Sequence, residues 1–210
     1  MKGLMLYDLY KFRALYWKNL LLVSALYLVM TLALRTTALL YAIVWMSSIY
    51  AIGLLSSDGG WTRFARALPV SPKAMAGAKF LTTGFYELAG LLYALALGGI
   101  VCALCAEPFG ELLLSALSIT LFATLFNAIA LPCVLKWGAG RMRVIMVLIY
   151  ALLIVALTSL AGMGDSALTG ASAWLNANIG PIMGLFLAVT IAVCVIGWAA
   201  TAQIYAHREE

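Results

Sequence analysis

The hydrophobic residues of this chain fall into long runs that shorter polar segments interrupt. Six runs have about the length that a helix needs to cross a bilayer, which is about 20 residues. They occupy residues 18–34, 37–56, 80–105, 112–135, 143–161 and 180–204. The pattern predicts an all-α integral membrane protein with six membrane-spanning helices in a single transmembrane domain over residues 1–210.

Composition and charge support a membrane protein. Apolar residues make up 65 % of the 210 residues and charged residues 10 %, and the mean hydropathy is +1.06. Soluble domains are about half apolar and about a quarter charged. The net charge is +5, but the basic residues lie at the ends of apolar runs. We therefore expect contact with the lipid bilayer and none with nucleic acid.

The basic residues also predict the orientation of the chain. If the N-terminus is cytoplasmic, twelve of the 13 lysines and arginines lie in inner segments and Arg35 alone lies outside. The outer loops carry Glu107, Glu111 and Asp165 instead. Because inner segments of membrane proteins are enriched in lysine and arginine, this distribution predicts that both termini are cytoplasmic.

Two further segments have patterns typical of the membrane surface. Residues 3–17 place Asp8 and Lys11 on one helical face among leucines and aromatic residues, as in an amphipathic helix that lies in the interface. Residues 162–179 are weakly polar and contain Trp174. They form either a flexible loop or a short interfacial helix, and the tryptophan favours the helix.

The long polar connection at residues 57–79 has a pattern of its own. Apolar side chains spaced i, i+3, i+4 and i+7 predict a two-turn amphipathic helix over residues 61–68. These side chains are Trp61, Phe64, Ala65 and Leu68. Pro69 predicts the end of that helix. Ser71 and Pro72 are typical of an N-cap and a first helical position, so a second helix from residue 72 is expected to continue into the third span.

This connection allows two interpretations from the residues alone. A short surface helix joined through a sharp break to a span can pass a push from a cytoplasmic partner to the transmembrane helix. The same helix can instead anchor the loop among lipid headgroups. The residue pattern does not separate the two.

Several residues of this connection resemble the small bacterial ABC-2 type transporter permeases. Trp61, the LPVS run at 68–71 and Lys79-Phe80 are similar to the W…LPVS(R/P)…K(Y/F) segment that follows the second span in that family. The opening MKGLMLYDLY, the chain length and the six expected spans are similar as well. Pro72 departs from the basic residue that is common there, and Lys73 is a candidate to supply that charge.

The resemblance implies the transmembrane subunit of an ABC exporter in the bacterial cytoplasmic membrane. Such a permease forms a homodimer and pairs with two copies of an ABC ATP-binding subunit, which holds ATP and magnesium. The helix at 61–68 would be the coupling helix that docks on that subunit, and the similar exporters carry amphipathic or antimicrobial peptides. The coupling residues that it implies are Trp61, Arg63, Phe64, Arg66, Leu68 and Pro69.

Sequence motifs for chemistry within this chain are absent. No Walker A pattern, G-x-x-x-x-G-K-(S/T), occurs, and neither H-E-x-x-H nor G-x-S-x-G is present. All four cysteines fall inside apolar runs, where they act as small apolar residues. We therefore expect no catalytic, cofactor-binding or metal site in this chain, and no enzymatic activity of its own.

Polar residues within the apolar runs are the remaining candidates for function. Glu87 is the one acid inside a run, and an ionisable residue in a span is a functional candidate. It follows Lys79 by about two turns, so we expect it near the inner headgroups within reach of water, which favours a structural or interfacial role. Thr120, Thr124 and Asn127 share one face of the fourth span. They either bridge helices, which we favour, or line a translocation path with Glu87.

The last span begins with two glycines that lie one turn apart. Gly180 and Gly184 form a small-xxx-small pair, which permits close approach of another helix. The pattern does not identify the neighbour.

Two functions are compatible with these features. The first is the permease of an ATP-driven exporter for an amphipathic peptide or another hydrophobic compound. The alternative is a proton-linked carrier or a membrane assembly factor that uses Glu87 and needs no ATPase.

Overall fold

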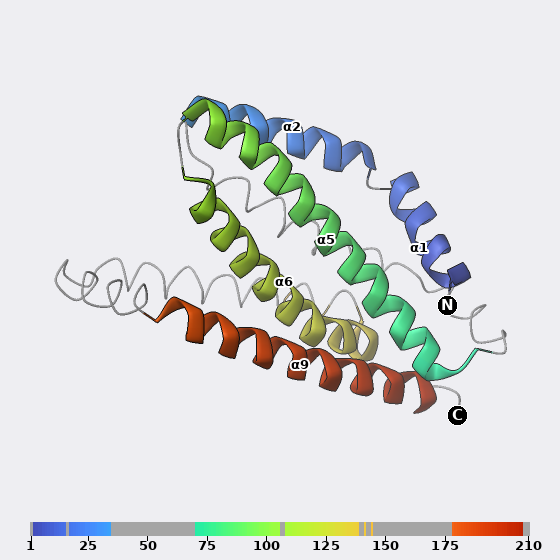
Figure 1. Ribbon diagram of the computed structural model, residues 1–210. Helices are drawn as coiled ribbons and strands as arrows, with labels where there is room; N and C mark the ends of the chain where they lie inside the picture. The colour runs from blue at the N-terminus through green and yellow to red at the C-terminus, as the bar shows by residue number, and fades with distance from the viewer. Residues whose placement is uncertain are drawn as a thin grey trace.

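The computed structural model describes residues 2–15, 17–34, 70–105, 108–138, 141, 144 and 178–207. This part of the chain is helical and contains no strand. Its helices, shown in Figure 1, are α1 (Lys2–Leu15), α2 (Trp17–Leu34), α5 (Pro72–Cys105), α6 (Phe109–Trp137) and α9 (Ile179–His207).

Three of the described helices are long and apolar enough to cross a membrane, namely α5, α6 and α9. Helix α2 contains a shorter apolar stretch, Leu21–Ala33. These helices cover the predicted runs at 18–34, 80–105, 112–135 and 180–204. The runs at 37–56 and 143–161, apart from residue 144, and the segment 162–177 lie outside the described residues, so the six-span arrangement stays a prediction.

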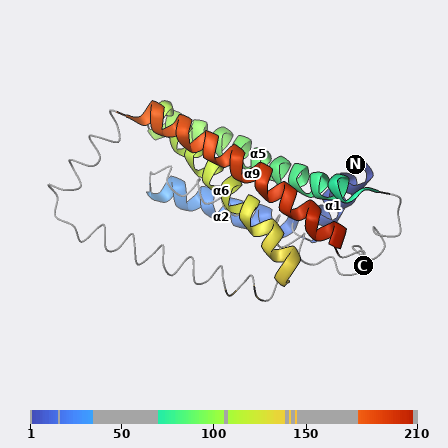
Figure 2. The ribbon, with the colours of Figure 1, turned by 90° about the horizontal axis from the view of Figure 1, so that it is seen from below.

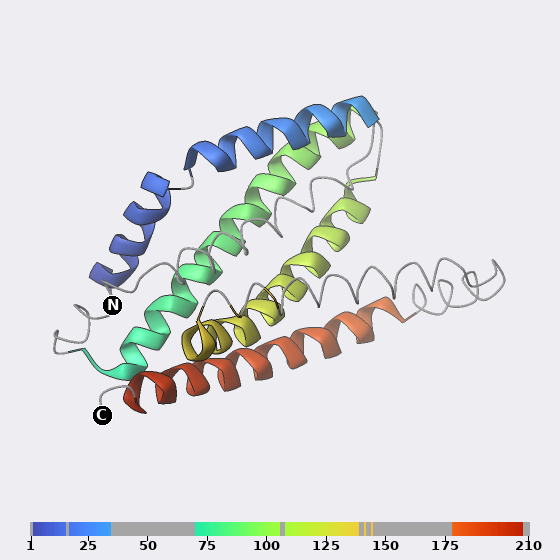
Figure 3. The same cartoon turned by 180° about the vertical axis from the view of Figure 1, so that it is seen from behind.

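Helices α5, α6 and α9 form the core of the described bundle. Each contacts the other two, most extensively α6 and α9, and Figures 1 and 2 show the three side by side from two directions. Helices α1 and α2 attach along α5, and Figure 3 shows α1 beside the first half of α5. Small residues line the core contacts, since Ala94, Ala116 and Ala123 are at most 1 % exposed. Small side chains let membrane helices approach closely.

Helix α5 begins where the sequence predicts. The Ser71 side-chain oxygen accepts a hydrogen bond from the Ala74 backbone N–H at 3.3 Å, and its carbonyl oxygen accepts from Ala74 and Met75 at 2.9 and 3.1 Å. Pro72 has no N–H to leave unsatisfied in the first turn. The helix then runs without interruption to Cys105. The polar segment before it is therefore joined directly to a membrane-length helix.

The two ends of the bundle differ in charge. Lys73 and Lys79 lie near the start of α5 and Lys136 lies in the last turn of α6, whereas Glu111 lies in the first turn of α6. In Figure 1 the start of α5 and the end of α9 meet at the lower right, far from the end of α5 and the start of α9. By the positive-inside rule, the lysine-bearing end is favoured on the cytoplasmic side. This end is termed the inner end.

A close backbone approach between α6 and α9 lies at a glycine that the sequence pattern did not single out. Nothing lies within 4 Å of a Cβ placed on Gly180 or Gly184, so none of the described helices makes a close contact at this pair. A Cβ on Gly197 would overlap the carbonyl oxygen of Ala128 in α6. Pro132 has no N–H, so that carbonyl lacks its usual helical donor. The Gly197 Cα can therefore approach it directly.

Candidate functional site

The candidate site is a polar cluster between α5 and α6. The Glu87 carboxyl group contacts Thr124 Oγ1 at 2.6 Å through one oxygen and Asn127 Nδ2 through the other. Glu87 is 3 % exposed and Asn127 is 2 % exposed. Glu87, Thr124 and Asn127 are termed the Glu87 cluster.

Helical periodicity explains why these side chains meet. Glu87 belongs to the buried stripe of α5, together with Thr83, Leu91 and Ala94 at helical spacing. On α6, Thr124 and Asn127 are three residues apart and therefore share a face. The prediction that Glu87 reaches water near the headgroups is wrong, because the rotation of α5 directs its side chain against α6.

Thr120 lies one turn before Thr124 but bonds within α6. Its hydroxyl donates to the Ala116 carbonyl at 2.8 Å, and its own carbonyl lies 2.9 Å from Thr124 Oγ1. The structure thus brings three of the four predicted residues together. The fourth, Thr120, contacts the Thr124 hydroxyl through its backbone carbonyl oxygen.

The Thr124 hydroxyl has one proton and two oxygen neighbours, Glu87 Oε2 and the Thr120 carbonyl. Both contacts are made in full when the hydroxyl donates a hydrogen bond to the Thr120 carbonyl and accepts a hydrogen bond from a protonated Glu87. When Glu87 is ionised, the two acceptors share the one proton of Thr124. The cluster can therefore hold a proton at Glu87 as well as tie α5 to α6.

A second polar contact, which the sequence did not predict, joins α1 to α5. Lys79 Nζ lies 2.8 and 3.0 Å from the two carboxylate oxygens of Asp8, and the Tyr86 hydroxyl donates to the Asp8 carbonyl at 3.3 Å. Asp8 is completely buried. One signal was available, since Asp8 is the only acidic residue in the N-terminal region before Asp58. The sequence could not show which of many basic residues it would meet.

A hydrophobic cluster at the inner end fixes the junction between the polar connection and α5. Its buried members are Met75 and Ala76 of α5 and Ala202 and Tyr205 of α9. Val70, Leu135 and Trp198 pack against them. Val70 precedes α5, while Leu135 and Trp198 belong to α6 and α9, so the first described residue after the polar connection is packed into a cluster that joins all three core helices.

The residues predicted to couple the chain to a partner lie outside the described residues. They are Trp61, Arg63, Phe64, Arg66, Leu68 and Pro69. Their role and the helix at 61–68 stay predictions.

The three described apolar helices of membrane length indicate a membrane protein. Residues 3–206 match the family model described as ABC-2 family transporter protein. The chain therefore belongs to the ABC-2 transporter family and is a permease of an ABC transporter, a membrane subunit whose family implies an ABC ATP-binding partner. No curated protein and no solved structure matched the chain.

Proposed function

We propose that this permease is the membrane subunit of an ATP-driven exporter in the bacterial cytoplasmic membrane. Two copies of the chain form the translocation path, and each docks on one ABC ATP-binding subunit that holds ATP and magnesium. The transported compound is an amphipathic peptide or another hydrophobic compound. Family membership supports the permease role, and the apolar helices with few charges suit such a compound better than a sugar.

The observation that carries the coupling mechanism is the packing of Val70. The predicted coupling helix at 61–68 ends two residues before Val70, which packs at the inner end against the buried cluster of α5 and α9 that Leu135 of α6 also contacts. A push on the coupling helix by a closing ATP-binding subunit is therefore delivered to all three core helices. Packed helices of this kind move as rigid bodies between two arrangements.

The Glu87 cluster is our candidate for the polar part of the path. It lies between α5 and α6, and its carboxyl group, hydroxyl and amide can exchange their mutual hydrogen bonds for bonds to a polar group of the substrate. Asn127 Oδ1 is buried and accepts no hydrogen bond in the described part of the chain, so it can accept one from a substrate. Thr120 extends the same face of α6 by one turn.

The test begins with coexpression of the chain and the ABC ATP-binding subunit encoded nearest to it. We expect the two to copurify at equal stoichiometry in detergent and to hydrolyse ATP. In vesicles, Leu68→Ala and Arg66→Ala are expected to keep the complex but to lower ATP-dependent transport of a labelled amphipathic peptide by about tenfold, since either removes a contact of the docking helix.

Arg13→Ala is the matched control, because Arg13 is an exposed arginine in the last turn of α1 and lies outside the predicted coupling helix. Normal transport by the Leu68 and Arg66 variants would remove the coupling role of residues 61–68. Failure of every coexpressed ATP-binding subunit to copurify would remove the exporter proposal itself.

A proton-linked carrier is the second candidate. The observation that favours it is the Thr124 hydroxyl, which has one proton but two oxygen neighbours, Glu87 Oε2 and the Thr120 carbonyl. The cluster makes its contacts in full when Glu87 is protonated, as a proton carrier requires in one half of its cycle. In this case Glu87→Gln abolishes proton-driven uptake of the peptide into vesicles without ATP. Glu111→Gln, an exposed acid in the first turn of α6, is the control and keeps full transport. ATP-dependent transport that survives Glu87→Gln excludes this candidate.

A further inference from the structure

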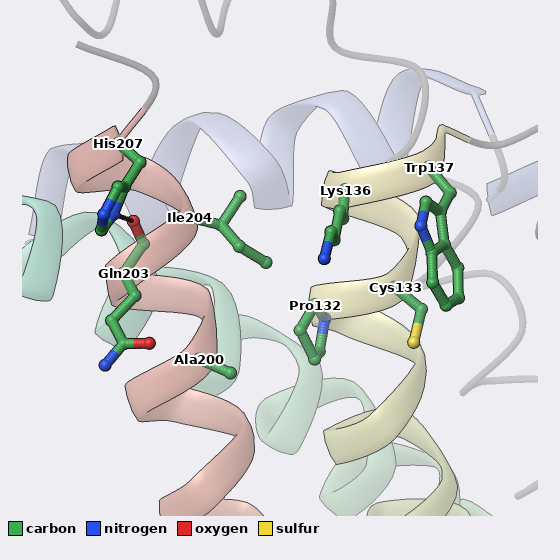
Figure 4. Close-up of a pocket in the computed structure, with 8 residues that line it drawn as sticks. All are labelled: Pro132, Cys133, Lys136, Trp137, Ala200, Gln203, Ile204 and His207. Carbon is green, nitrogen blue, oxygen red and sulfur yellow. Dashed lines mark hydrogen bonds between the residues drawn. The ribbon is translucent and has the colours of Figure 1, made fainter. Parts of the chain in front are cut away.

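A pocket of about 600 Å³ opens between the inner ends of α6 and α9, away from the Glu87 cluster (Figure 4). One part of its lining is apolar. Pro132 and Cys133 of α6 and Ala200 and Ile204 of α9 line this part. The side chain of Ile204 points into the gap between the helices in Figure 4.

The rim of the pocket is polar and basic. Lys136 and Trp137 of α6 and Gln203 and His207 of α9 line it, and no acidic residue of the described chain does. Figure 4 shows the Lys136 ammonium group directed into the gap between the helices. The rim thus offers the positive charge of Lys136 to an anion, and its lining also carries an indole N–H and a side-chain amide that can donate to other groups of a larger headgroup.

The geometry of the two helix ends holds this rim in place. Gly138 adopts a positive φ of 82° directly after α6, and its N–H donates to the Val134 carbonyl at 2.9 Å, which fixes the turn that carries Lys136. On α9, His207 Nδ1 lies 3.0 Å from the Gln203 carbonyl. A residue other than glycine would be strained at position 138.

Exposed apolar residues continue from the pocket toward the middle of the membrane on both helices. On α9, Ile196 lies one turn before Ala200 and is 67 % exposed. On α6, Ile129 lies one turn before Cys133 and is 50 % exposed. The pocket and these residues form a surface that is basic at the inner end and apolar toward the middle of the two helices.

We propose that this surface binds an anionic phospholipid of the inner leaflet. The phosphate lies at Lys136, the headgroup hydroxyls lie at Gln203, and an acyl chain follows Ile129 and Ile196. A free phosphate would use the rim but not the apolar stripe, and a soluble partner would not reach a stripe that lies at membrane depth. Basic pockets between transmembrane helices on the cytoplasmic side are suited to such headgroups. The proposal is independent of the ATP-binding partner and of the direction of transport.

The test is native mass spectrometry of the full chain after equilibration with phosphatidylglycerol, phosphatidylethanolamine and phosphatidylcholine of identical acyl chains. We expect the wild-type chain to retain phosphatidylglycerol preferentially. Lys136→Gln is expected to lower its retention about fivefold, the contribution of one lysine near an anionic headgroup, and to leave the two other lipids unchanged. Lys136→Arg is expected to restore it, since the charge returns.

Lys73→Gln is the matched control, because it removes one exposed lysine from the same end of the bundle but not from the pocket. Equal losses in Lys73→Gln and Lys136→Gln would overturn the proposal, since binding would then depend on overall charge. Displacement of the lipid by inorganic phosphate at the same concentration as the lipid would also overturn it, because the acyl chain would then contribute nothing.

Ala200→Leu tests the pocket without a change of charge. The larger side chain fills some of the apolar part of the pocket, so phosphatidylglycerol retention is expected to fall although Lys136 is intact. If the Lys136→Gln chain does not stay folded in detergent, Ala200→Leu decides the question. Unchanged retention in Ala200→Leu would place the lipid elsewhere on the chain and overturn the proposal.

Discussion

The two faces of α6 hold their neighbours by different means. Toward α5, Thr124 and Asn127 contact the carboxyl group of Glu87. Toward α9, the Ala128 carbonyl faces Gly197 at a separation that leaves no room for a Cβ. One contact consists of hydrogen bonds between side chains, and the other depends on the absence of a side chain.

The difference bears on which contact can change during transport. Hydrogen bonds between side chains can be broken and remade with other partners, and in membranes such bonds contribute only about 1 kcal/mol each. A close backbone contact has no partner to exchange and is lost when the helices separate. We therefore expect α6 and α9 to move as one unit and the interface between α5 and α6 to be the one that opens.

The largest expected effect comes from Gly197→Ala. The added methyl group meets a backbone oxygen, which cannot change rotamer, so we expect a loss of about 3 kcal/mol, at the upper end of the cost of overpacking. Thermal unfolding in detergent, followed by fluorescence-detected size exclusion, measures the loss. Gly184→Ala is the control, since nothing lies within 4 Å of its Cβ position, and alanine favours the helix there. Equal losses in the two variants would contradict the close contact at Gly197.

A smaller loss is expected from Glu87→Ala. It leaves the Asn127 amide without its acceptor in a buried site and removes one of the two oxygens at the Thr124 hydroxyl, which costs about 2 kcal/mol. Glu87→Gln keeps an acceptor oxygen and is expected to cost less than about 1 kcal/mol. Leu88→Ala is the control for truncation on α5, because Leu88 is 53 % exposed. If Glu87→Gln destabilises the chain as much as Glu87→Ala, hydrogen bonding does not hold this interface.

The sequence predicted those features that depend on local spacing. The Ser71-Pro72 pair marked the start of α5, because capping and the fixed φ of proline act within one turn. The spacing of Thr124 and Asn127 showed that they share a face of α6. The apolar runs gave the ranges of the described helices to within a few residues, except that α5 begins ahead of its run, as the cap predicted.

Features that depend on a neighbouring helix could not be predicted in the same way. Periodicity shows which residues share a face but not what that face meets, so Glu87 was placed near water although it faces α6. Gly197 is one of 18 glycines, and its role depends on Ala128 and Pro132 in another helix. The Gly180 and Gly184 pair had the better pattern, yet no neighbour lies within 4 Å of their Cβ positions in the described helices.

The smallest expected effect concerns the ion pair between Asp8 and Lys79. It is a third kind of contact between helices, held by charge, beside the hydrogen bonds and the close backbone contact of α6. The Lys79 side chain is 14 % exposed, so it can still reach water or headgroups when Asp8 is removed. We therefore expect a double-mutant cycle of Asp8→Ala and Lys79→Ala to give a coupling of about 1 kcal/mol, near the upper end for partly exposed pairs. Lys73→Ala combined with Asp8→Ala is the additive control, because Lys73 is exposed and lies outside the contact.

The exchanged pair, Asp8→Lys with Lys79→Asp, is expected to recover part of the stability that Asp8→Lys alone loses. A coupling near zero would mean that α1 is held on α5 by its apolar contacts and by the Tyr86 hydrogen bond, and that the charges only orient it.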